Sequence, residues 1–109
     1  MSDFEVTVTD DGVGVVRPLD RLTMVSAKRF TGHVADLIGG GTSRIVVDLS
    51  GTGFVDSSGL GALIAGLKSA RQAGGDLRLA APTEQVLTIL SLTNLDKVLR
   101  PRDSVADAF

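Results

Sequence analysis

The sequence predicts an α/β fold in which helices pack against a mixed sheet of four or five strands. Short runs with the apolar pattern of strands alternate with longer stretches in which apolar residues recur at helical spacing. The first two strands form a hairpin, and a hairpin followed by strand–helix alternation is typical of a mixed sheet. The chain of 109 residues has no internal repeat or linker, so we expect a single domain over residues 1–109.

The first elements are the hairpin and a helix. Apolar and polar residues alternate from Phe4 to Val8, and after a turn at residues 10–12 the strand pattern resumes over residues 13–17. Pro18 either ends this strand or makes it an edge strand, because proline has no backbone N–H to donate to a sheet. A helix follows, and three consecutive glycines end it. Its apolar positions are Ala27, Phe30, Val34, Leu37 and Ile38.

The central stretch of the chain runs from a strand directly into a second helix. Residues 45–49 are an apolar run rich in β-branched side chains, which is typical of a covered strand. After a short connection at residues 50–53, apolar residues recur at the spacing of one buried helical stripe. The helix is therefore predicted to begin near Ser57 or Ser58. Its stripe consists of Leu60, Leu63, Ile64 and Leu67.

The next part of the chain repeats the strand–helix order. Two glycines at residues 74–75 end the second helix, and residues 77–80 are predicted to form a short strand. Pro82 suits the first turn of a third helix, and Glu84 is favourable near the positive end of that helix. Its apolar side is formed by Val86, Leu87, Ile89 and Leu90.

Two further elements are predicted near the end of the sequence. Residues 97–100 have the pattern of a short fifth strand. Ser104 and Asp107 stand three residues apart, which resembles a capping box and predicts a brief terminal helix.

The polar turn before the second helix has two interpretations. Asp56, Ser57 and Ser58 can cap the first free N–H groups of the helix, and serine caps are common. Capping does not explain Gly59 and Gly61, each of which costs a helix about 0.5–1 kcal/mol relative to alanine. Glycines would leave the surface bare around the hydroxyls, and the positive helix end would accommodate an anion. The turn is therefore also a candidate phosphoserine site.

Composition excludes several classes of function. Without cysteine the chain has no disulfide, cysteine–zinc site or catalytic thiol. A net charge of -2, no basic cluster and four aromatic residues, all phenylalanine, argue against a nucleic-acid surface. The sequence begins without the basic and apolar regions of a signal peptide, and no window has the ~18 apolar residues of a membrane span. We therefore expect a cytoplasmic protein that does not insert into membranes.

Catalysis by the chain is not expected. A serine hydrolase would need a Gly-x-Ser-x-Gly elbow and a histidine, but the turn reads Asp-Ser-Ser-Gly and His33 is the only histidine. We expect His33 to be an exposed helical residue. No phosphate-binding loop of the Gly-x-x-x-x-Gly-Lys-Ser/Thr type follows a strand.

Residues 54–61, Phe-Val-Asp-Ser-Ser-Gly-Leu-Gly, closely resemble the signature of bacterial anti-sigma factor antagonists, which are members of the STAS domain family. The resemblance covers nearly the whole chain. Residues 71–77 resemble the segment that leads into the family's next strand, and residues 90–95 resemble its apolar stretch with a central polar pair. Leu19 and Asp20 match the family's Leu-Asp before the first helix, where the aspartate belongs to the partner-facing surface.

The chain departs from the family pattern at one place. The family usually has a glycine two residues before the leucine of the Leu-Asp pair, whereas this chain has Arg17 followed by Pro18. The substitution bears on the shape of the first loop and so on the role of Asp20.

The resemblance implies a partner-switching function. In the family the serine directly after the aspartate is phosphorylated, which by position is Ser57. The unphosphorylated antagonist binds an anti-sigma factor that is also an ATP-dependent serine kinase, and this releases a sigma factor. Phosphorylation ends the complex, and a metal-dependent serine phosphatase restores it. The chain itself would need no cofactor or metal and catalyse nothing. The residues expected to bind the partner are Asp20, Thr23, Asp56, Ser57, Ser58 and Gly59.

A second function remains open for a STAS domain. Family members also serve as constitutive adaptors in lipid-transport complexes or large stress-sensing assemblies. The complete turn with both serines favours the switch, but a serine can also persist as a helix cap.

Overall fold

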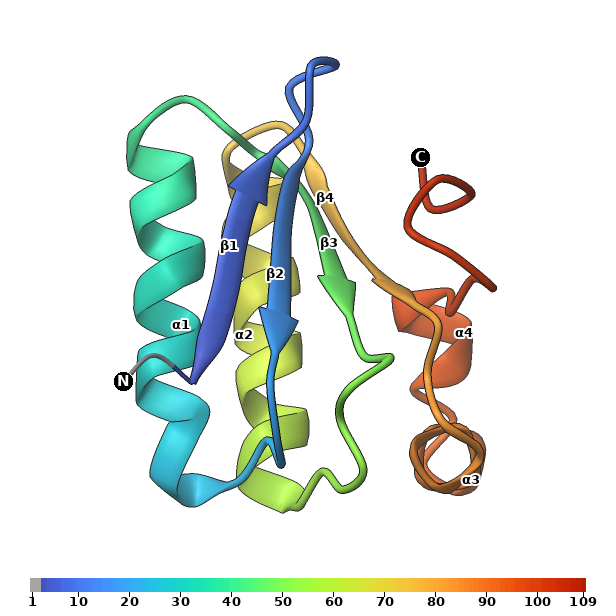
Figure 1. The fold of residues 1–109 in the computed structure, drawn as a ribbon. Coiled ribbons are helices and arrows are strands. Elements are labelled where there is room, and N and C mark those ends of the chain that lie inside the picture. The colour runs from blue at the N-terminus through green and yellow to red at the C-terminus, as the bar shows by residue number, and fades with distance from the viewer. Residues whose placement is uncertain (1–2) are drawn as a thin grey trace.

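A computed structural model describes residues 3–109 of the chain and contains a four-stranded mixed sheet (Figure 1). The strands lie in the order β1-β2-β3-β4, with β1 and β2 antiparallel and the remaining pairs parallel. The elements along the chain are β1 (Phe4–Val8), β2 (Gly14–Pro18), α1 (Met24–Gly39), β3 (Arg44–Asp48), α2 (Ser57–Gln72), β4 (Asp76–Ala80), α3 (Glu84–Leu92) and α4 (Asp96–Leu99).

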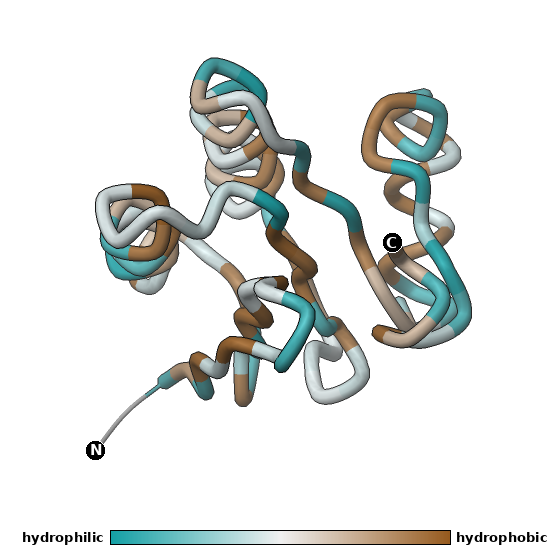
Figure 2. Tube along the Cα trace, turned by 90° about the horizontal axis from the view of Figure 1, so that it is seen from above, coloured by the Kyte–Doolittle hydropathy of each residue, from teal (hydrophilic) through white to brown (hydrophobic). Residues whose placement is uncertain are grey.

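Helices α1 and α2 lie side by side on one face of the sheet, and α3 lies beyond β4 (Figure 2). The apolar stripes of α1 and α2 bury Phe30, Val34 and Leu63 in the main core. Alternate strand residues point to opposite faces of a sheet. Ile45 and Val47 join the main core, whereas Val46 packs on the opposite face. The unbroken apolar run of β3 is therefore explained by burial on both faces.

The C-terminal segment, residues 101–109, covers part of the second face of the sheet. Val105 and Ala108 pack there in a smaller apolar cluster with Val13, Val46 and Ala80. An isolated parallel β-bridge pairs Arg102 of this segment with Ala80 at the end of β4. It adds no strand to the sheet.

The predicted fifth strand is wrong. Residues 97–100 belong mostly to the short helix α4, which buries Leu99. The chain turns sharply on both sides of this helix, because Asn94 and Arg100 have positive φ angles of 59° and 49°. A pattern of four residues is too short to distinguish one helical turn from a strand.

The predicted terminal helix is also wrong, although its capping contacts form. Ser104 Oγ lies 3.0 Å from Asp107 Oδ2, and the Asp107 N–H donates to Ser104 Oγ at 3.3 Å. The chain forms only a turn at this point, and Ala108 then packs against the sheet.

Two smaller expectations also need correction. Pro82 precedes the third helix instead of lying in its first turn, and Thr83 caps α3 by accepting from the Val86 N–H at 3.4 Å. His33 is half-buried, and its ring meets the ring of Phe4 edge-on at 5.1 Å between centroids.

The glycine stops are confirmed, since Gly41 and Gly74 follow α1 and α2 with positive φ.

The two long helices begin at the same end of the molecule (Figure 1). The chain just before α1 runs beside the turn before α2, and an isolated parallel bridge joins Leu22 to Val55. Within residues 3–109 there is no helix with the length and apolar character needed to cross a bilayer.

Candidate functional site

Residues 54–59, the serine turn, comprise the turn before α2 and the first three residues of that helix, and Asp56 is their central polar group. Its Oδ1 accepts a hydrogen bond from the Gly59 N–H at 2.8 Å, which caps α2. Its Oδ2 accepts from the Met24 N–H at 3.1 Å, at the first residue of α1. The positive ends of two helices thus share one carboxylate.

The two serine hydroxyls are not used as caps. Ser57 and Ser58 are the first two residues of α2, and within residues 3–109 neither side chain makes a hydrogen bond. The capping interpretation of these serines is therefore wrong, because Asp56 performs that role. Ser57 is exposed and Ser58 is half-buried. Accessibility to another molecule is greater at Ser57.

Gly59 and Gly61, the two glycines near the start of α2, have different structural roles. Gly59 is buried, and a Cβ at this position would overlap the Leu22 carbonyl oxygen and lie 2.9 Å from Val55 Cγ1. The expectation that glycine leaves the surface bare is wrong for Gly59. It holds for Gly61, which is exposed and whose Cβ would have nothing within 4 Å.

Backbone contacts hold the start of α1 against the serine turn. The Leu22 N–H donates to the Phe54 carbonyl at 2.9 Å, and the Asp56 N–H donates to the Leu22 carbonyl at 3.2 Å. Thr23, half-buried, is the N-cap residue of α1, and its N–H donates to Ser26 Oγ at 3.1 Å. The structure thus brings Thr23 and Asp56 together with Ser57, Ser58 and Gly59.

Asp20 lies beside this group and lines a neighbouring cleft. The cleft has a volume of about 360 Å³ and is also lined by Arg21, Thr23, Val25 and Arg29. Arg29 forms an ion pair with Asp3 across its edge. Asp20 is exposed and makes no hydrogen bond or ion pair within the described part of the chain, residues 3–109. Its carboxylate is therefore free to meet a partner.

Sequence reasoning missed the apolar character of this end of the molecule. Met24 and Val25 are 75% and 74% exposed, and Leu19 and Phe54 are each 43% exposed. A signal was available, because Met24 and Val25 lie off the apolar stripe of their helix. Exposed apolar residues next to polar ones are common at protein–protein interfaces.

Arg17, the departure from the family pattern, lies near the loop that leads to the serine turn. Its Nη1 forms an ion pair with Glu5 Oε1 at 2.9 Å. A Cβ on Gly51 would lie 3.6 Å from Arg17 Nη2, so the guanidinium packs against this loop. The pairing of β2 with β1 continues past Arg17, since Pro18 is in register with Phe4.

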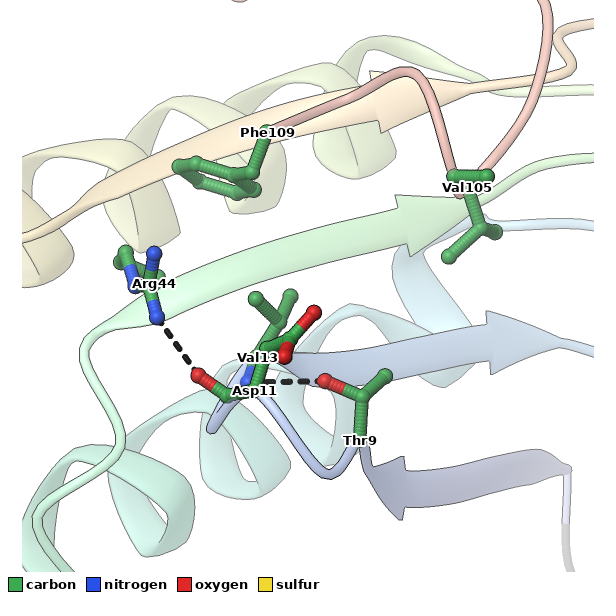
Figure 3. A pocket seen from close by; sticks show the side chains of 7 residues that line it. Thr9, Asp11, Val13, Arg44, Val105 and Phe109 are labelled. Atoms are coloured by element: carbon green, nitrogen blue, oxygen red, sulfur yellow. Dashed lines mark hydrogen bonds between the residues drawn. The ribbon is translucent and has the colours of Figure 1, made fainter.

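A second pocket lies where β2 and β3 begin, far along the sheet from the serine turn (Figure 3). Its volume is about 430 Å³, and an Arg44 Nη2 atom donates to the Asp11 carbonyl at 2.6 Å on its edge. The residues labelled on its wall are Thr9, Asp11, Val13, Arg44, Val105 and Phe109. None of the residues expected to bind a partner lines it.

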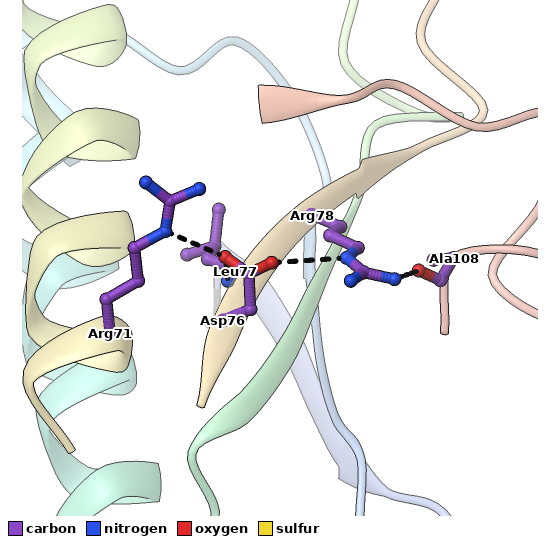
Figure 4. Close-up of polar contacts among 5 residues, drawn as sticks. All are labelled: Arg71, Asp76, Leu77, Arg78 and Ala108. Atoms are coloured by element: carbon purple, nitrogen blue, oxygen red, sulfur yellow. Dashed lines mark hydrogen bonds and ion pairs between the residues drawn. The ribbon is translucent and has the colours of Figure 1, made fainter. Parts of the chain in front are cut away.

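A polar network ties the C-terminal segment to β4 (Figure 4). Asp76 accepts from Arg71 Nε at 3.2 Å and from Arg78 Nε at 3.3 Å. Arg78 also donates to the Ala108 carbonyl at 2.8 Å and lies over the Phe109 ring. Burial by itself would raise the pKa of Asp76, but the hydrogen bonds from the Leu77 N–H and the two arginines outweigh it and hold that pKa below its ordinary value.

Comparison with known proteins leads to the same family as the sequence motif at residues 54–61. The pattern that defines the STAS domain matches residues 5–108. A Thermotoga maritima protein named "Putative anti-sigma factor antagonist" is 34% identical over 106 residues, which cover 96% of this chain and 93% of that protein. A crystal structure of a Thermotoga maritima protein of the same description has a TM-score of 0.87 at 32% identity, with 95% of this chain and 89% of that chain covered.

A more distant structure has the same fold. The anti-sigma factor antagonist SpoIIAA in its unphosphorylated form has a TM-score of 0.82, with 95% of this chain and 90% of that chain covered. Its identity of 16% makes this a likeness of fold alone. The domain match over nearly the whole length and the related antagonists mean that the chain belongs to the STAS domain family.

Proposed function

We propose that this protein is an anti-sigma factor antagonist controlled by phosphorylation of Ser57. The unmodified protein binds an anti-sigma factor that is also a serine kinase, and phosphorylation of Ser57 by that kinase ends the complex. A serine phosphatase restores the free hydroxyl. The chain acts as a binding protein, without a cofactor and without catalysis of its own. It works in the cytoplasm and affects transcription only through its partner, without contacting nucleic acid or entering a membrane.

The observation that carries the proposal is the free hydroxyl of Ser57. It is exposed at the first residue of α2, while Asp56 supplies the cap that a serine would otherwise provide. Helix capping therefore does not account for this serine. Ser58 is a less accessible target because it is half-buried.

The surroundings of Ser57 support a switch at an interface. A phosphate brings about -1.5 to -2 charges at neutral pH, which the start of a helix tolerates. The same charge beside exposed Met24, Val25 and Phe54 would be costly once a partner covers it. Phosphorylation is thus expected to weaken binding while the fold persists.

The test combines phosphopeptide mass spectrometry with partner capture from the native cell. Wild type, Ser57→Ala and Ser57→Asp serve as baits, and Ser58→Ala is the matched control. The expected result is phosphate on Ser57, retention of an anti-sigma factor kinase by wild type and Ser57→Ala, and its loss from Ser57→Asp. The purified kinase with ATP should modify wild type and Ser58→Ala but not Ser57→Ala.

The adaptor function makes the opposite prediction. A constitutive adaptor of a lipid-transport or stress-sensing complex would capture the same transporter or scaffold subunits with all four baits. An unmodified Ser57 across growth conditions, together with that capture pattern, would contradict the switch.

A further inference from the structure

Asp56 makes more contacts than helix capping requires. An N-cap side chain needs only the bond to the first turn of its own helix, here the Gly59 N–H. The second bond, to the Met24 N–H, reaches the first residue of α1, which lies 32 residues earlier in the chain. This bond attaches the first turn of α1 to the serine turn.

The second bond places Asp56 between the modification site and an apolar surface. Ser57 follows Asp56 directly in the chain, while Met24 and Val25 form the start of α1, whose Met24 N–H donates to the same carboxylate. These two side chains are the most exposed apolar ones of α1. One carboxylate therefore contacts the backbone of both parts of the candidate interface.

The two bonds of Asp56 are unequal. The bond to Gly59 is 2.8 Å long and partly buried, whereas the bond to Met24 is 3.1 Å long and exposed. Exposed hydrogen bonds compete with water and are the easier ones to break. A perturbation of Asp56 is expected to affect the Met24 bond first.

A phosphate on Ser57 is such a perturbation. It would add about -1.5 to -2 charges next to the carboxylate of Asp56. Within residues 3–109 no acceptor takes the N–H groups of Ser57 and Ser58, so the phosphate has donors at the start of α2. The two anions then repel each other at one helix end.

We propose that Asp56 is a positioning residue that transmits phosphorylation of Ser57 to the start of α1. Repulsion by the phosphate weakens the Asp56–Met24 bond, and the first turn of α1 leaves the arrangement that the partner binds. This proposal deepens the proposed function and rests on it. It predicts that phosphorylation of Ser57 changes the backbone at Met24 and Val25, in addition to placing a charge at the interface.

The first test measures amide hydrogen exchange by NMR in the isolated protein. Ser57→Asp should raise the exchange rate of the Met24 amide about fivefold or more, while Ser69→Asp, an exposed site near the far end of α2, should not. Asp56→Ser can still cap Gly59 but is uncharged and too short to reach Met24 as well. In that variant exchange at Met24 should already be fast, and Ser57→Asp should add nothing.

The second test measures partner affinity with the kinase that the capture experiment identifies. Phosphorylation should weaken binding of the wild type at least about fivefold more than it weakens binding of Asp56→Ser. Equal ratios in the two backgrounds, or equal Met24 exchange in Ser57→Asp and Ser69→Asp, would overturn the role of Asp56. Fast Met24 exchange in Ser57→Asp without any captured kinase would support the coupling and overturn the proposed function alone.

Discussion

At the scale of single residues, the serine turn requires a residue without a Cβ at position 59. The backbone of Leu22 occupies the space that a Cβ of Gly59 would need, and backbone cannot shift as the end of a flexible side chain can. Gly61, two residues further along the same helix, faces open space. The two glycines therefore have opposite consequences for stability.

Gly59→Ala should lower the free energy of unfolding by about 2–4 kcal/mol, because the first turn of α2 must move away from Leu22. Gly61→Ala should raise it by up to about 1 kcal/mol, since alanine favours the helix and meets no neighbour. Urea unfolding followed by circular dichroism measures both. Similar losses in the two variants would contradict the packing role of Gly59.

Asp76 gives a prediction that depends on pH. Because its pKa is below the ordinary value of 3.8 in the folded protein, its stabilisation is present above that value and is lost as the pH falls below it. Asp76→Asn should lower the free energy of unfolding by about 1–2 kcal/mol at pH 7. The difference from wild type should shrink as the pH drops below about 4.

The matched control for this comparison is Asp103→Asn. Asp103 is exposed and has no hydrogen bond or ion pair among residues 3–109, so its substitution should change little at either pH. Urea titrations at pH 7 and pH 3 compare the three proteins. A loss in Asp76→Asn that is equally large at both values would rule out the charged network as its cause.

At the scale of elements, the sequence was informative where a pattern was long. The stripes of α1 and α2 and the apolar run of β3 predicted these elements, and the start of α2 and the bounds of β3 lie within about one residue of the prediction. The four residues at 97–100 could not establish a period, and α4 formed where a strand was expected. The contact between Asp56 and Met24 could not be predicted either, because it depends on how two distant segments pack.

The attachment of the C-terminal segment depends on one arginine. Arg78→Ala removes the hydrogen bond to the Ala108 carbonyl and the contact with the Phe109 ring. Residues 101–109 should then be cleaved faster in limited proteolysis, by about threefold or more. Arg71→Ala is the control, since Arg71 shares Asp76 but does not contact the segment. Equal cleavage in both variants would contradict this role of Arg78.

At the scale of the whole molecule, the polar and apolar features of the candidate interface lie at one end. The serine turn and the start of α1 are there, while the 430 Å³ pocket lies toward the beginnings of β2 and β3. The sequence predicted the polar residues at the first end. It did not predict the exposed apolar ones: the position of Met24 and Val25 off their helical stripe was a usable signal, but the exposure of Leu19 and Phe54 becomes visible only when the fold is known.

Met24→Ser should weaken binding of the kinase about tenfold, because methionine at the centre of an interface contributes buried apolar area. Leu92→Ser is the matched control, since Leu92 is 79% exposed on α3 and Met24 is 75% exposed. Isothermal titration calorimetry with the captured kinase compares the two. Equal weakening would place the partner elsewhere on the surface.

The bridge between Leu22 and Val55 joins the segment before α1 to the serine turn, so the surface that they form together needs both segments. A chain that is still emerging from the ribosome has made residues 19–24 before residues 54–59, so it cannot yet offer the joined surface. A partner that recognises this surface therefore selects finished molecules over nascent or unfolded ones. It also protects them, since a partner present at one hundred times its dissociation constant adds about 2.7 kcal/mol to the stability of the native state.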